Sequence, residues 1–386
     1  MPTVTSTNLS KLIPIYYEKR MLERLVPQLF FYQFGEKKAL PKREGQSVYW
    51  HRWNDVKLGR MIAESGAGAG EGISATRVSA QLLLIGHHAK VTTYIDMVSI
   101  NSIVQGAIDL FADSSAKTVD FVTSRFLLWK LASVSATIQV SSAAGYIGDL
   151  WQTMSSQAKL TAIGCSTLSS AKWQAPVYCI NDLTKRTYSL SAGCAGGTSG
   201  TEWTPNILRT IALKLKVKNA LRFEDGYYKL IMHPDMVHQL RSSSAFIDLH
   251  KYVESGASTF EKGTLRNGTE RGLEGFLEGF KIYSSTEAPM FSTSGVLGGT
   301  ANGKRAQVSA FGGGRLYFNF AFGKGAYGVT DFDGGIRTFI KTPGPSSTDN
   351  PLDLYSTVGY RAIFTAKVLN PSACMWIVNG RPKTVG

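Results

Sequence analysis

Residues 101–133 read NSIVQGAIDLFADSSAKTVDFVTSRFLLWKLAS, and this stretch decides how the rest of the chain is interpreted. Its large apolar residues recur at steps of three and four, which places them along one side of an α-helix. Ser99 or Asn101 can cap the start of the helix, and no proline interrupts it. Such a helix is a rod of roughly 50 Å, far longer than the average globular helix. We predict a spine helix whose buried stripe consists of Val104, Ile108, Phe111, Val122, Phe126 and Trp129. A long helix in an unrelated large domain is the alternative.

The composition indicates a globular chain suited to an acidic partner. Its 386 residues include 42 Lys and Arg against 28 Asp and Glu, which gives a formal charge of +14. That balance favours nucleic acid or an anionic surface, although a basic soluble protein without such a partner explains it equally well. Charged residues make up only 18% of the chain, which fits a subunit that buries much surface against partners.

The cysteines and the lengths of the apolar runs indicate the cellular compartment of the chain. Cys165, Cys179, Cys194 and Cys374 fit no zinc spacing, and the chain is too large to be a small disulfide-stapled domain. We therefore predict reduced thiols. No apolar run reaches the ~20 residues that a membrane-spanning helix needs, and the first residues lack the order of a secretory signal. We expect the chain to be made and kept in a cytoplasm, with no membrane partner.

Residues 1–93 are predicted to form an arm followed by a long hairpin. A short amphipathic helix at 14–31 leads into a basic extended segment around Pro41, which blocks a helix there. The aromatic residues of this arm should lie on the same subunit or on a neighbour. Strands are predicted at 47–53 and 79–94, separated by a Gly-rich tip at 64–72. A phosphate-binding loop is rejected because the G-x-x-x-x-G-K-[ST] spacing is absent and no helix follows.

The later part of the chain divides into three segments. Residues 134–200 are rich in Ser, Ala, Thr and Gly, and we predict a small inserted β-rich lobe there. Residues 201–295 indicate a compact α/β unit, with helices starting at Pro205 and Pro234, a third helix at 245–252, and strands at 227–232 and 279–284. From residue 306 onward the chain is β-rich and punctuated by glycine.

No constellation of residues predicts catalysis, a cofactor or a metal. His233 precedes its helix, so it does not share a helical face with His238 as a zinc site of the His-Glu-x-x-His type requires. The segment Asp331–Phe–Asp333–Gly resembles half a calcium loop but lacks the downstream Glu. No G-x-S-x-G elbow exists. We expect no catalytic residues, no cofactor and no metal site, and predict that the chain is not an enzyme.

The order of these segments resembles the major capsid protein of tailed bacteriophages, an α+β protein with the Johnson fold, and more narrowly the capsid family of the N-four-like podophages. The similarity lies in LVPQLFFYQFGEKKALPKREGQSVYWHRW (25–53), HHAKVTTYIDMVSIN (87–101), YYKLIMHPDM (227–236), GFKIYSSTEAPMF (279–291), FGKGAYGV (322–329) and NPLDLYSTVGYRAIFTAKVLNP (350–371). The Gly-Ala tip at 66–70 and the lobe at 134–200 depart from the family pattern.

The resemblance implies a division of the chain and a mechanical function. The implied parts are an N-terminal arm (1–45), an extended loop (46–93), a peripheral domain with the spine helix (94–140), an inserted lobe (141–200), an axial domain (201–304) and return strands (305–386). Copies would form hexamers and pentamers of an icosahedral head, in contact with a separate scaffolding protein, a portal protein, packaged double-stranded DNA and cement proteins. The implied location is the virion, assembled in the host cytoplasm.

The resemblance also suggests which residues meet neighbouring subunits. The expected interface residues are Phe30, Phe31, Tyr32, Lys37, Lys38, Arg43, Trp50, Arg52 and Glu71. A subunit lacking residues 1–35 is accordingly expected to fold but not to hold a closed shell. Two other classes stay open: a nucleic-acid-binding protein, favoured by the charge, and another virion protein such as a tube or decoration protein, favoured by the β-rich end.

Overall fold

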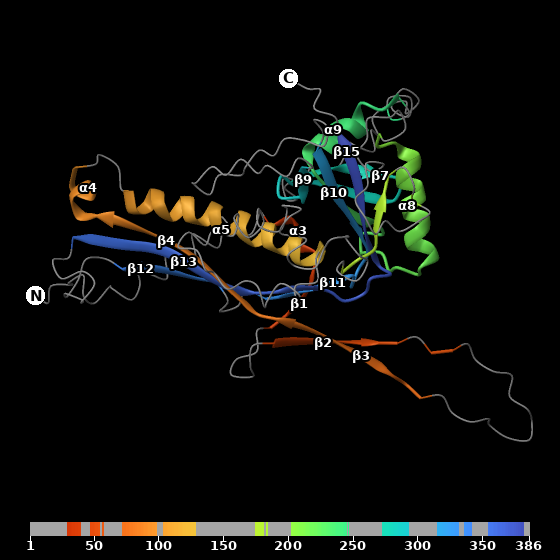
Figure 1. The fold of residues 1–386 in the computed structure, drawn as a ribbon, viewed down its shortest axis with the longest axis horizontal. Coiled ribbons are helices and arrows are strands. Elements are labelled where there is room, and N and C mark those ends of the chain that lie inside the picture. Colours follow the sequence, from red (N-terminus) through yellow and green to blue (C-terminus); the bar gives the residue numbers. More distant parts are fainter. Residues whose placement is uncertain are drawn as a thin grey trace, which may run out of the picture.

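The molecule is elongated, with a long helix lying over a narrow sheet at one end and an α/β unit at the other (Figure 1). The computed structural model describes residues 29–39, 47–54, 56–57, 72–98, 103–128, 174–180, 183, 202–244, 246, 272–292, 315–331, 336–341 and 354–381. A two-stranded hairpin projects beyond this body. The mixture of helices with parallel and antiparallel strands confirms the predicted α+β class.

The spine helix is α5 (Ile103–Leu128), whose 26 residues span about 39 Å. It lies on one face of a three-stranded sheet, the spine sheet, ordered β12 (Ile336–Lys341), β13 (Tyr355–Phe364), β4 (Leu83–Thr92). The short helix α4 (Thr93–Val98) follows β4. Alternation along β13 presents Tyr360 and Phe364 to the spine helix, where their rings lie 6.2 Å from those of Phe111 and Phe126.

The α/β unit is built on a seven-stranded sheet. Its strands run in the order β5 (Val177–Cys179), β15 (Cys374–Arg381), β10 (Arg315–Phe322), β6 (Tyr228–Met232), β8 (Phe280–Ser284), β7 (Leu273–Leu277), with β9 (Met290–Ser292) also pairing with β10. Helices α8 (Pro205–Val217) and α9 (Pro234–Arg241) pack on one face, and the end of the spine helix packs on the other. Strands β6 and β8 are almost continuously buried because both of their faces are covered. The predicted helices that start at Pro205 and Pro234 and the two predicted strands are confirmed, whereas the third predicted helix, at 245–252, lies outside the described residues except for Phe246.

A small sheet joins the two ends of the molecule. It consists of β1 (Glu36–Lys38), β11 (Tyr327–Thr330) and β14 (Ala366–Val368), with β1 parallel to β11. Just before β1 lies a single helical turn, α3 (Phe30–Gln33). Residues near the start of the chain therefore pair with residues some 290 positions later.

The hairpin consists of β2 (Ser47–Trp53) and β3 (Ala75–Gln81), paired from Ser47↔Gln81 to Trp53↔Ala75. The predicted return strand at 79–94 is wrong, because the chain changes partner at Leu82. Beyond that residue β4 forms its own ten-residue ladder with β13. A run of β-forming residues predicts a strand but does not say which neighbour it joins.

The prediction of reduced thiols is wrong for Cys179, which is disulfide-bonded. Cys374 is free and buried, as expected. Compartment and spacing arguments say nothing about which thiols the fold brings together. The Gly-rich tip at 64–72, except Gly72, and most of the 134–200 lobe also lie outside the described residues.

Candidate assembly surfaces

Residues 29–38, here called the arm segment, pack into their own subunit through Leu29, Phe31 and Tyr32, which are buried. The side chain of Phe31 is fully buried, and its ring lies 6.4 Å from that of Trp376 and 6.5 Å from that of Phe320. Tyr327 donates its hydroxyl hydrogen to the carbonyl of Phe31 at 2.6 Å, and Tyr32 donates to the carbonyl of Thr330 at 3.0 Å. The arm segment thereby fills the space between the spine helix and the seven-stranded sheet.

A buried carboxylate on the spine helix holds this segment in place. Oδ1 of Asp120 accepts the backbone N–H groups of Phe31 at 2.6 Å and Tyr32 at 3.3 Å, and Oδ2 has no hydrogen-bond partner. Burial raises the pKa of the Asp120 carboxyl to about 7, against the lowering effects of these backbone N–H groups and of Arg125. Burial, together with the charge of Asp120, raises the pKa of Tyr327 well above its usual value.

These contacts correct part of the predicted subunit interface. Phe31 and Tyr32 are core residues of their own subunit and are not available to a neighbour. Phe30 is half-buried, with its ring directly against Gly272, where an added Cβ would lie 2.3 Å from the ring. Lys37 is exposed, with its ammonium 5.6 Å from the centre of the Tyr32 ring. Half-buried Lys38 donates to the carbonyl of Tyr49 and so ties β1 to the hairpin.

The base of the hairpin is also anchored in its own subunit. Trp50 is only 4% exposed and packs with Val48, Ala80 and Leu369. Its indole ring lies so close to Gly328 that a Cβ there would come within 2.6 Å, so glycine is required at that position. The prediction that Trp50 contacts a neighbour is therefore wrong. Alternation along β2 explains this, because Val48 and Trp50 share the face turned toward the body.

The far part of the hairpin behaves differently. Trp53, Val56 and Ile73 expose 70%, 58% and 74% of their surfaces, and Figure 1 shows these ends of the strands extending beyond the body. Arg52 is exposed as well. Apolar groups gathered at the end of a projecting element are characteristic of a contact surface for another protein. Arg43 and Glu71 lie outside the described residues.

The spine helix matches its predicted stripe where the structure describes it. Ile108, Phe111, Val122 and Phe126 are buried, whereas Trp129 and the side chain of Val104 lie outside the described residues. The stripe did not predict the buried polar side chains Ser115, Asp120, Thr123 and Ser124. The three hydroxyls among them are satisfied by carbonyls three or four residues earlier in the helix.

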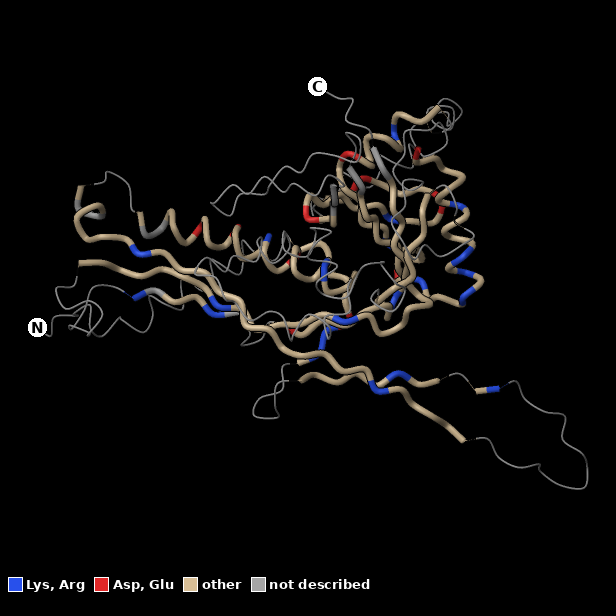
Figure 2. Tube along the Cα trace, viewed as in Figure 1, with Lys and Arg blue, Asp and Glu red and all other residues tan. Residues whose placement is uncertain are grey.

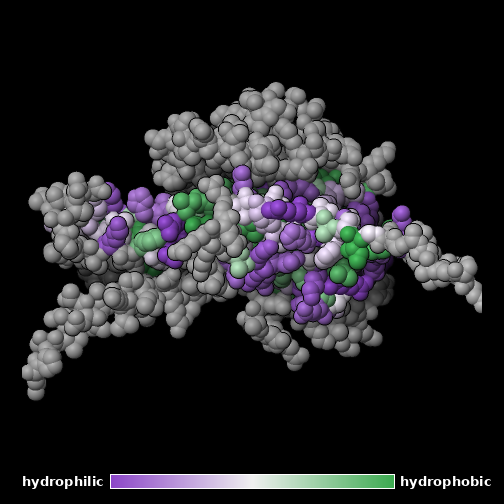
Figure 3. Space-filling view, turned by 90° about the horizontal axis from the view of Figure 1, so that it is seen from below, coloured by the Kyte–Doolittle hydropathy of each residue, from purple (hydrophilic) through white to green (hydrophobic). Residues whose placement is uncertain are grey.

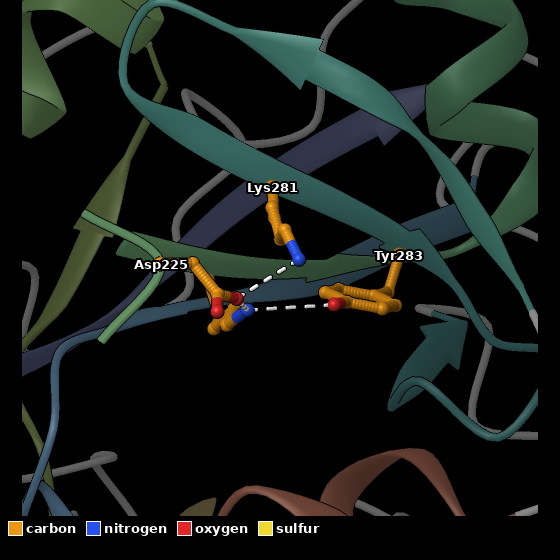
Figure 4. A network of polar contacts seen from close by, with 4 residues as sticks. Asp225, Lys281 and Tyr283 are labelled. Carbon is orange, nitrogen blue, oxygen red and sulfur yellow. Dashed lines mark hydrogen bonds and ion pairs between the residues drawn. The ribbon is translucent and has the colours of Figure 1, made fainter. Parts of the chain in front are cut away.

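A lysine pair in the α/β unit was not predicted at all. Lys229 and Lys281 face each other on the parallel strands β6 and β8, and both ammonium groups lie within 2.9 Å of Oδ2 of Asp225 (Figure 4). Hydrogen bonds from the two lysines lower the pKa of Asp225 to about 2. The ammonium group of Lys229 also lies 5.4 Å from the centre of the ring of Phe34, in the arm segment. The ionised carboxylate thus offsets the charge of two buried ammonium groups, which would otherwise repel each other across the two strands.

His233, which was rejected as part of a zinc site, caps a helix. Nδ1 of His233 accepts the backbone N–H of Asp235 at 3.2 Å at the start of α9, and Tyr317 donates a hydrogen bond to the Asp235 carboxylate. The described residues contain no group of three or more His, Cys, Asp or Glu that could bind a metal ion. No helix within the described ranges is both long and apolar enough to cross a membrane.

Comparison with known proteins identifies the fold of the chain. No family model and no curated protein matches the chain. Among solved structures, the capsid of Ralstonia phage GP4 matches with a TM-score of 0.56 at 12% identity, over 92% of this chain and 87% of that one. The chain has the fold of a phage capsid protein. The capsid of cyanophage Pam1 (TM-score 0.55, 11% identity, 92% of both chains) and the acidic stable capsid of Helicobacter pylori bacteriophage KHP30 (0.52, 9%, 93% and 90%) match likewise. This likeness confirms the predicted Johnson fold.

Proposed function

We propose that the chain is the major capsid protein of a tailed bacteriophage, whose copies assemble into hexamers and pentamers of an icosahedral head. The observation that carries the proposal is the capsid fold over about nine-tenths of the chain, joined to a hairpin whose exposed apolar end its own subunit does not cover. The function is mechanical, and the described residues suggest no reaction. Membership of the N-four-like group is part of the proposal and rests on the sequence blocks.

The hairpin would act as a strap between subunits. Trp53, Val56 and Ile73 would enter a neighbouring copy, while Trp50 keeps the base of the hairpin fixed to its own body. Such a contact joins two different surfaces, and repeating it around an axis closes a ring of five or six copies. Lys37 and Arg52 are exposed, and in this proposal they would meet charged groups of a neighbour or packaged DNA. Arg43 and Glu71 complete the proposed contact set.

The remaining parts take their roles from this assignment. The spine helix and spine sheet would form the peripheral domain, and the α/β unit with its helices α8 and α9 would form the axial domain around each ring. Assembly would take place in the host cytoplasm with a separate scaffolding protein and a portal protein, and the finished shell would enclose double-stranded DNA, with cement proteins as further partners in the virion.

The test is to express the chain and examine it by size-exclusion chromatography and electron microscopy. We expect ring oligomers or closed shells. A hairpin variant carrying Trp53→Ser and Ile73→Ser should remain soluble and folded but fail to form them, whereas Leu221→Ser, which changes an exposed apolar residue away from the hairpin, should assemble. A chain that stays monomeric under all assembly conditions, or a hairpin variant that assembles normally, would overturn the proposal.

A further inference from the structure

The spine sheet has one covered face and one open face. Its covered face packs on the spine helix, and Figure 3 views the molecule from the opposite side. Alternation along the strands places the side chains of Arg337, Lys341, Arg361 and Lys90 together on the open face, and all four are exposed. Figure 2 shows basic residues along these strands and acidic residues along the spine helix.

The cations are arranged in two rows across the strands. Arg337 stands directly opposite Arg361, and Lys341 shares a row with Thr357 and Lys90. The rows are four residues apart, which corresponds to about 13 Å along a strand. Between them lie Phe339, Gly359 and His88, so the middle of the face carries a phenyl ring and an imidazole on either side of a glycine.

Within the described residues, no carboxylate neutralises this face. Among the described residues, none of the four cations has a carboxylate partner, and the strands of this sheet carry no acidic residue on this face. Arg361 lies 5.3 Å from the ring of Phe339, and Lys90 lies 4.5 Å from that of Tyr355. Like charges directly opposite each other on neighbouring strands are destabilising, so the Arg337–Arg361 pair costs stability in the isolated subunit. A bound anion would relieve that repulsion.

Apolar groups are exposed beside the cations. Leu84, on the row next to Arg361, is 66% exposed, and Phe339 is 40% exposed. Cations together with exposed apolar groups on a flat face suit a polypeptide better than a nucleic acid duplex, because the backbone of a duplex presents phosphates and leaves the apolar groups uncovered. A second copy of this chain is a poor anion donor, since each copy carries a formal charge of +14.

We propose that the open face of the spine sheet docks an extended acidic segment of a different protein. Carboxylates four residues apart on that segment would meet the Arg337–Arg361 and Lys341–Lys90 rows, and an apolar residue between them would cover Phe339. The arginine row can bind carboxylates in a bidentate manner, so it should contribute most. The inference concerns this face alone and stands whether or not the chain forms capsids.

The test uses the full chain and two synthetic twelve-residue peptides in a fluorescence-anisotropy titration at low salt. In one peptide Glu occurs every fourth residue with Val midway between, and in the other the same residues are rearranged so that all Glu are adjacent. We expect the spaced peptide to bind at least tenfold more tightly than the rearranged one. The double variant Arg337→Gln/Arg361→Gln should lower its affinity at least tenfold, and Phe339→Ser should lower it less.

The matched control removes two exposed cations elsewhere. Arg209→Gln/Lys324→Gln breaks the surface ion pairs with Glu278 and Glu224 and should leave peptide binding within twofold. The Arg337→Gln/Arg361→Gln variant should unfold at the same temperature as the unaltered chain or higher, since it loses a like-charge contact. Equal binding of the two peptides, or unchanged binding in this variant, would overturn the proposal. Tight binding of a 20-base-pair DNA that is lost in this variant, without peptide binding, would overturn it in favour of nucleic acid.

Discussion

The arm segment and the hairpin are neighbours in sequence, but the arm segment packs into the body of the subunit and the hairpin projects from it. Both are aromatic and basic, and both were expected to reach neighbouring subunits. In the structure Phe31 is fully buried in its own core, whereas Trp53 is 70% exposed. Even within one strand the contrast holds, since Trp50 is 4% exposed and lies only three residues before Trp53. Aromatic content therefore does not separate a core segment from a contact surface.

What separates the two regions is where their backbone polar groups find partners. The N–H groups and carbonyl of the arm segment bond to Asp120 and Tyr327, which lie on other elements of the body. The hairpin strands bond to each other, with Asn54, Ser74 and Thr76 closing the far end. A segment whose polar groups are satisfied only by the body cannot leave it, because buried groups without partners are costly. A self-paired hairpin is free to contact another molecule.

The largest expected effect comes from Phe31→Ala. Loss of a fully buried aromatic side chain should lower the free energy of unfolding by about 3–5 kcal/mol, measured by urea denaturation of the subunit. Deletion of residues 1–35 removes the same buried side chain. The sequence predicted that the truncated chain would fold, whereas the structure predicts that it should fail to fold. If the Phe31→Ala subunit were as stable as the unaltered one, the arm segment would not be part of the core and would not differ from the hairpin in this respect.

Asp120 should make the anchorage of the arm segment dependent on pH. Its folded pKa of about 7 lies above the usual 3.8, so its contribution to stability is fully present below about pH 4 and is lost as the pH rises through 7. Urea denaturation should show a loss of up to about 4 kcal/mol between pH 4 and pH 8 from this group. Asp120→Asn keeps the hydrogen-bond acceptor but cannot ionise. The variant should therefore lose this dependence of the free energy of unfolding on pH and be more stable than the unaltered chain at pH 8.

A second variant separates charge from hydrogen bonding. Asp120→Ala also removes the slope, but it leaves the N–H groups of Phe31 and Tyr32 without their acceptor and should be less stable than Asp120→Asn at every pH. If the unaltered chain and Asp120→Asn showed the same pH dependence, the carboxylate would not titrate in this range.

A smaller effect is expected within the hairpin. The guanidinium of Arg77 lies 3.4 Å from the centre of the Tyr49 ring, across the two strands. Arg77→Gln should lower the free energy of unfolding by about 0.5–1 kcal/mol, read from the thermal midpoint of the subunit. A change as large as that of Phe31→Ala would mean that the hairpin contributes to the core.

The smallest effect on folding is expected from Trp53→Ser. Surface substitutions usually change stability by no more than about 0.5 kcal/mol, and this side chain makes little contact with its own subunit. Sedimentation should nevertheless show fewer assembled particles than the unaltered chain gives. Trp50→Ser is the paired control, since it should destabilise the subunit itself, and a reversed order of the two variants would contradict the comparison.

Local patterns predicted the elements, and long-range contacts decided their partners. The spacing of Ile108, Phe111, Val122 and Phe126 predicted the spine helix and its buried side, because that signal is contained in one segment. The inward position of Phe31 depends on Asp120, 89 residues away, and no local pattern encodes that distance. The disulfide at Cys179 and the lysine pair around Asp225 were missed for the same reason.

The contacts of the arm segment also set the order in which the chain can be completed. Tyr32 bonds to Thr330 and Phe31 to Tyr327, pairs separated by 298 and 296 residues. At 5–20 residues per second, a ribosome needs about 15–60 s to make the chain between these partners. The arm segment must therefore wait, with its aromatic side chains outside their final core, until nearly 300 further residues have been synthesised. The core around the arm segment therefore closes only after β11 has emerged from the ribosome, and this order of events makes the closure a late step of folding.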